Sequence, residues 1–133
     1  LDVTSAPDSR AWQWGPVPEE YLRAWKDLGG GPILSAALKI QLDLDDIEIN
    51  VARFADRCHG SDYDDLIARP LAELRSMTDF AGLSWPESYE REMKNVPFHD
   101  TRDKWKQHLS EEEGNRVLEF FHRTKESTSP AYA

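Results

Sequence analysis

Cysteine is nearly absent from this chain of 133 residues, because Cys58 is the only one. A single cysteine excludes an intrachain disulfide and a thiolate metal cluster, and it fits a reducing compartment slightly better than a secreted one. A cytoplasmic location is therefore expected. Long hydrophobic runs are missing as well: no stretch approaches the roughly 18 to 20 apolar residues of a membrane span, and residues 1–18 lack a signal-peptide pattern. We therefore expect no membrane association.

Positively charged residues are also scarce. The chain has 16 Lys and Arg against 25 Asp and Glu, which gives a formal net charge of -9. Such a field repels phosphate backbones and anionic lipid, so a nucleic-acid partner is not expected. A small anion is not excluded, because helix N-termini and a few Arg or Lys side chains can hold one locally.

The alternating pattern of β-strands is missing too, and the fold class expected is therefore mostly α. Residues 1–17 are rich in Pro and Trp and predict an irregular segment. Residues 18–123 predict a single helical domain, and residues 124–133 predict a flexible tail. Start and stop signals place the helices at about 18–28, 33–58, 70–81, 86–94 and from 111 onward.

The clearest periodicity belongs to the second of these helices. Apolar residues recur there at alternating spacings of four and three, which is one face of a long helix. We call this set the apolar seam and predict that it is buried, with a coiled-coil partner as the alternative. Its members are Ile33, Ala37, Ile40, Leu44, Ile47, Val51, Phe54 and Cys58.

The last helix carries a local start signal. Ser110 followed by Glu113 at the third helical position is a capping box. The apolar residues after it predict a core face. They are Val117, Leu118, Phe120 and Phe121.

The run from Thr101 to Lys106 concentrates three cations and an indole in an acidic protein. Such a cluster can clamp a phosphate and stack on adenine. The alternative is a solvated basic turn with Trp105 in the core. His59 with Asp62, Asp64 and Asp65 is an alternative candidate for a hard-metal site, but no established metal-binding spacing is present and no metal is expected.

Three segments occur in an order that is similar to a known family. Residues 62–74 read DYDDLIARPLAEL, residues 75–88 read RSMTDFAGLSWPES, and residues 100–113 read DTRDKWKQHLSEEE. This succession resembles the sulfotransferases that use 3'-phosphoadenosine 5'-phosphosulfate. The resemblance covers roughly residues 33–121.

The resemblance implies the helical C-terminal portion of a P-loop-like α/β sulfotransferase fold, with the nucleotide-binding sheet half missing. It implies transfer of sulfate to a hydroxyl acceptor, either a small molecule or a protein. Arg102, Lys104 and Trp105 are then the candidates on the cofactor side. His99, next to Asp100, is the candidate base that takes the acceptor proton, with an ordinary surface histidine as the alternative.

A stretch near the start is similar to the family's segment for the 3'-phosphate, where Ser9 and Arg10 are the donors that remain. The family's Gly-Ser/Thr-rich loop is not present in this chain. The chain alone is therefore expected to be inactive, with the missing half upstream or on a partner chain. The alternative is a non-enzymatic helical module derived from a sulfotransferase, whose apolar seam binds another protein or its own copy as a homo-oligomer.

Overall fold

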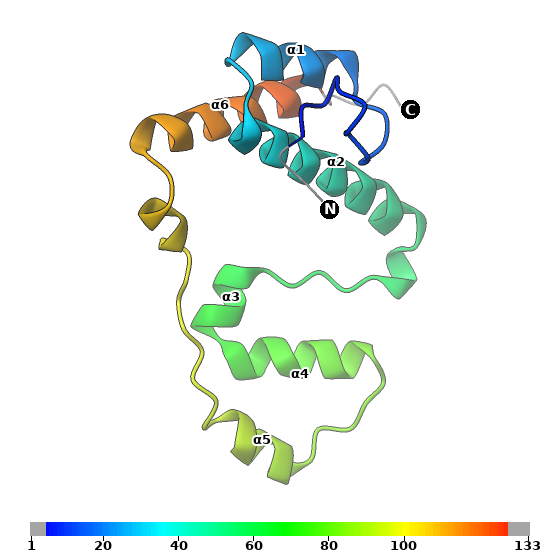
Figure 1. Ribbon diagram of the computed structural model, residues 1–133. Helices are drawn as coiled ribbons and strands as arrows, with labels where there is room; N and C mark the ends of the chain where they lie inside the picture. The colour runs from blue at the N-terminus through cyan, green and yellow to red at the C-terminus, as the bar shows by residue number, and fades with distance from the viewer. Residues whose placement is uncertain (1–4, 128–133) are drawn as a thin grey trace. The chain divides into compact units, whose positions relative to one another are not determined.

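The structure is a computed structural model that describes residues 5–127, and over that range it contains helices and no strand (Figure 1). This confirms the mostly α fold class. Two short 3-10 helices, Ala55–Arg57 and Lys104–Gln107, accompany the α-helices. The six α-helices are α1 (Glu19–Asp27), α2 (Pro32–Arg53), α3 (Tyr63–Ala68), α4 (Pro70–Phe80), α5 (Glu87–Met93) and α6 (Glu111–Ser127).

The described residues divide into two compact units. Unit 1 comprises the residues up to Asn50 together with those from Trp105 onward, and unit 2 comprises Val51–Lys104. The single helical domain expected over residues 18–123 is not tested by this division and stays a prediction.

Local signals fix most of the helix boundaries. α1 begins after Pro18 with two acidic residues in its first turn, which favour the positive end of the helix dipole. It is followed by three glycines with positive φ, and the second of them, Gly30, lies so close to Trp25 that an added Cβ would be 2.8 Å from the indole. The helix predicted at about 18–28 is therefore confirmed, and glycine is required at position 30 by both backbone conformation and space.

The core of unit 1 forms where α1, α2 and α6 come together (Figure 1). Tyr21 of α1, Leu34 and Leu38 of α2 and Phe120 of α6 each keep at most 1% of their accessible surface. Trp12, from the irregular segment, packs against this cluster. Burial of these large side chains is the main stabilising contribution in unit 1.

Hydrogen bonds connect the same three helices inside this core. The Tyr21 hydroxyl donates to Asp45 at 2.7 Å, the Gln41 amide donates to the other oxygen of Asp45 at 2.7 Å, and the Thr124 hydroxyl donates to Gln41 at 3.2 Å. Buried polar groups are stable only with such partners. The network therefore sets which faces of the three helices meet.

The predicted burial of the apolar seam is wrong for most of its members. α2 does bury Ala37 of the seam, together with Leu34, Leu38 and Gln41, which lie beside the seam on the helix surface. The helix also ends at Arg53, so Cys58 is outside it. The exposed fractions of the seam residues are 51% for Ile40, 45% for Leu44, 57% for Ile47, 45% for Val51 and 37% for Phe54.

α6 begins as predicted. Ser110 Oγ accepts a hydrogen bond from the Glu113 backbone N–H at 3.2 Å, and the Glu113 carboxylate accepts from the Ser110 backbone N–H at 2.8 Å. Phe120 is in the core as expected, but Leu118 is wrong because it is 63% exposed. The predicted tail starts too early, since α6 continues to Ser127 and Thr124 is buried. Residues 128–133 and 1–4 lie outside the described residues.

Unit 2 is built differently. α3 packs on α4, and Trp85 meets Tyr89 edge to face at 4.8 Å. α4 and α5 confirm the helices predicted at 70–81 and 86–94, whereas α3 is not among the predicted helices. None of its residues, all of which are described, reaches full burial. Unit 2 therefore has helices without a sealed core.

Candidate functional site

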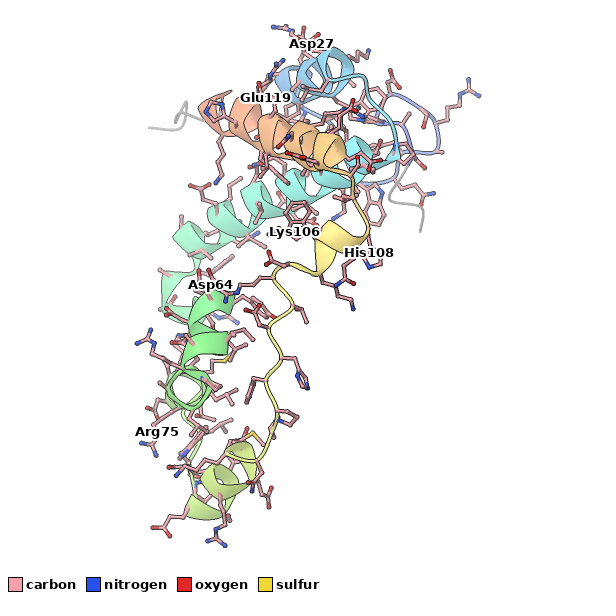
Figure 2. All side chains as sticks on the ribbon, turned by 90° about the vertical axis from the view of Figure 1, so that its left-hand side faces the viewer. Asp27, Asp64, Arg75, Lys106, His108 and Glu119 are labelled. Carbon is pink, nitrogen blue, oxygen red and sulfur yellow. The ribbon has the colours of Figure 1, made fainter. Side chains whose placement is uncertain are left out.

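Arg102, a predicted cofactor-binding residue, is occupied by two carboxylates of its own unit. Its Nη2 donates to Asp100 at 2.6 Å, its Nε donates to Asp100 at 2.9 Å, and its Nη1 donates to Asp64 at 3.1 Å (Asp64 is labelled in Figure 2). The hydrogen bonds from Arg102 lower the pKa of Asp100 to about 2 and raise the pKa of Arg102 above its ordinary value. A phosphate would have to displace these carboxylates from the guanidinium.

The Tyr63 hydroxyl of α3 connects the segment around His99 to that helix by hydrogen bonds. Tyr63 Oη lies 2.8 Å from Thr101 Oγ1 and donates to the His99 carbonyl at 3.4 Å. The His99 ring itself is on an exposed residue. Tyr63 is 44% exposed, and its contact with residues 36 and 38 positions away has no signal in the local spacing.

Trp105 combines features of the two alternatives, an indole that stacks on adenine and a tryptophan in the core. Its indole packs against α6, where an added Cβ on Gly114 would be 2.9 Å from Cζ3, yet 44% of the residue stays exposed. Lys106, labelled in Figure 2, places its ammonium 5.8 Å from the ring centroid. Trp105 is therefore partly a packing residue and partly an accessible aromatic surface.

The two candidates near the start are Ser9 and Arg10. Ser9 Oγ donates to the Ala6 carbonyl at 2.7 Å within a turn, and Arg10 is exposed. Together with Trp105 they belong to unit 1, whereas His99, Arg102 and Lys104 belong to unit 2. Neither unit by itself contains the complete predicted set.

A shallow hollow of about 520 Å³ in unit 1 contains none of the predicted site residues. Its one cation, Arg116, donates to the carbonyls of Leu28 and Gly30 at 2.7 and 2.9 Å. The remaining charged groups are carboxylates, which repel a phosphate. The lining residues are Leu28, Glu111, Glu112, Asn115, Arg116 and Glu119.

The side chains of the candidate hard-metal site make other contacts. His59 stacks on Phe80 with ring centroids 5.2 Å apart, Asp62 accepts from the backbone N–H of Asp64, and Asp64 also accepts from Arg102. Within residues 5–127 no group of three or more His, Cys, Asp or Glu is placed to hold a metal ion.

One surface feature of unit 1 combines regular spacing with exposure. We call Ile40, Leu44 and Ile47 the α2 row, since they lie at spacings of four and three on one face of α2 and are 45–57% exposed. Periodicity identified these residues, but it placed them in the core. What the α2 row offers chemically is apolar surface for another apolar surface.

Comparison of the chain with protein-family models, with curated proteins and with solved structures found no match. In the part of the chain that the structure describes, no helix has the length and apolar character needed to cross a membrane.

Proposed function

We propose that the chain is a helical protein-interaction module that binds a partner protein through the α2 row. The exposure of Ile40, Leu44 and Ile47 carries this proposal. Single exposed apolar residues are ordinary on protein surfaces. A row of them at helix spacing on one face is the pattern by which helices pair or enter grooves.

The side of α2 next to the α2 row already satisfies the core of unit 1. Leu34, Leu38 and Gln41 are buried there, and Gln41 bonds to α6 through Thr124. Because folding of unit 1 uses that stripe, the α2 row is apolar surface that the core does not need. An exposed apolar surface lowers the solubility of a protein. A role in binding a partner explains why this surface is exposed.

A photoreactive amino acid at position 44 tests the proposal in cells that make the chain. The matched control places it at Leu118, which is 63% exposed on α6 in the same unit. We expect a discrete cross-linked protein product from position 44 and none from position 118. Adding Ile40→Asp and Ile47→Asp should abolish the product, while equal products at both positions would contradict the proposal.

Trp105 favours a second candidate function, sulfate transfer. The residue is 44% exposed beside Lys106, and we propose that its accessible part stacks on adenine. On this candidate the chain is the helical C-terminal part of a sulfotransferase, acts in the cytoplasm, takes sulfate from 3'-phosphoadenosine 5'-phosphosulfate, and needs further sequence to hold the donor's phosphates.

Thermal melting with 3'-phosphoadenosine 5'-phosphate separates the two candidates. A ligand that binds the native state raises its melting temperature. The sulfotransferase candidate predicts a rise in the wild type that Trp105→Ala removes. An unchanged melting temperature at millimolar nucleotide contradicts it and leaves the interaction module.

A further inference from the structure

We infer that the partner of the α2 row is a cationic amphipathic helix. The inference rests on the proposed function and adds the chemical class of the partner. Residues 40–52 contain Asp43, Asp45, Asp46 and Glu48 and no Lys or Arg. The apolar surface of the α2 row is therefore embedded in a stretch of one charge sign.

Two of these carboxylates border the α2 row on opposite sides. Asp43 precedes Leu44 and Glu48 follows Ile47, and each step along a helix turns about 100°, so the two acids lie to either side of the apolar face. In a paired helix these are the positions where charge selects the partner. A partner with Lys or Arg beside its own apolar row would meet Glu48 on one border and Asp43, which pairs with Lys39, on the other.

The charges nearby do not cancel this preference. Asp43 pairs with Lys39, whose ammonium also lies 4.7 Å from the centroid of the Trp14 ring and whose side chain is only 17% exposed. Glu48 has no Lys or Arg three or four residues away in α2. Asp45 is held by Tyr21 and Gln41 and faces the core network. Glu48 thus presents an exposed carboxylate at one border of the α2 row.

A second copy of this chain fits the α2 row less well. In a parallel pair of α2 helices, Asp43 of one helix would lie beside Glu48 of the other. In an antiparallel pair no Lys or Arg from residues 40–52 would meet either acid. Each copy also carries a net charge of -9, which opposes self-association.

The test uses the full chain and two synthetic helical peptides of about three heptads. Both peptides carry Leu at the core positions, and one has Lys while the other has Glu at the bordering positions. Binding is measured by fluorescence anisotropy at low and high salt. We expect the Lys peptide to bind, to weaken as salt rises, and to exceed the Glu peptide.

Three variants locate the site. Leu44→Asp should weaken binding of the Lys peptide by about tenfold or more, because it places a charge in the apolar contact. Leu118→Asp is the matched control and should leave binding unchanged. Glu48→Lys should reduce binding of the Lys peptide by about threefold and improve binding of the Glu peptide.

The remaining outcomes contradict either the cationic partner alone or the interaction module as well. Equal binding of both peptides is compatible with the interaction module but contradicts a cationic partner. The same conclusion follows if position 44 gives a cross-linked product and neither peptide binds. Self-association in sedimentation that Leu44→Asp abolishes identifies a second copy as the occupant and overturns the inference. A lower melting temperature for Leu44→Asp, but not for Leu118→Asp, shows that the chain itself covers the α2 row, and both proposals then fail.

Discussion

Unit 1 and unit 2 are both built from helices with good local start signals, yet they bury very different amounts of themselves. Unit 1 seals Tyr21, Leu34, Leu38 and Phe120 from solvent, whereas the best-buried positions of unit 2 remain partly exposed. The contacts of unit 2 include ion pairs of exposed or partly exposed side chains, such as Arg75 with Glu90 at 2.9 Å and Arg102 with Asp64 at 3.1 Å. Exposed ion pairs stabilise little, so the comparison predicts unequal stability.

Matched phenylalanines should show the largest difference between the units. Phe120 is fully buried in unit 1, and Phe80 of unit 2 is 47% exposed and stacks on His59. We expect Phe120→Ala to lower the free energy of unfolding by about 3–5 kcal/mol. Phe80→Ala should cost about 0.5–1.5 kcal/mol, the range of one aromatic pair. Urea denaturation followed by circular dichroism measures both, and similar losses would break the comparison.

Gly114→Ala tests the close approach of Trp105 to α6. The new methyl group would meet the indole at 2.9 Å, and we expect a loss of about 1–3 kcal/mol. In a Trp105→Ala background the clash is gone, and alanine should then gain up to about 1 kcal/mol over glycine in the helix. Thermal melting of the wild type, both single variants and the double variant gives the coupling. If the two effects simply add, the indole does not rest on Gly114.

The helix caps of the two units sharpen the comparison at a smaller scale. Ser110 caps α6 and Asp62 caps α3. Ser110→Ala should cost about 1 kcal/mol, because one N-terminal backbone donor loses its acceptor. Hydrogen exchange should rise in the first turn of α6, while Asp62→Ala should affect α3 alone. Uniform faster exchange across both units would mean that the two caps do not act locally.

The smallest expected effect is acid loosening of unit 2. The folded pKa of Asp100 is about 2 against an ordinary 3.8, so its bond to Arg102 contributes stability that is complete above about pH 4 and is lost as pH falls toward 2. NMR titration of the Asp100 carboxyl should give a midpoint near 2, and Arg102→Ala should move it toward 3.8. A wild-type midpoint already near 3.8 would show that the pair does not form in solution.

Much of the secondary structure could be predicted because its signals are local. Pro70, Gly82 and the Ser110–Glu113 capping box mark helix ends through backbone geometry within a few residues. The candidate site was harder to predict. Arg102 was singled out for its charge, but Asp64, its partner 38 residues away, occupies the guanidinium. Proximity of that kind depends on the path of the chain and has no local signature.

Helix α2 shows what the sequence determines and what the tertiary structure determines. Its sequence by itself determined a long helix with one apolar seam, which includes Ile40, Leu44 and Ile47, and the structure separates from it a second stripe through Leu34 and Leu38. Only the tertiary structure decided which stripe is covered, because Tyr21 of α1 and Phe120 of α6 pack on the first. Periodicity is a property of one helix, while burial depends on the neighbours that reach it. The α2 row is exposed for that reason.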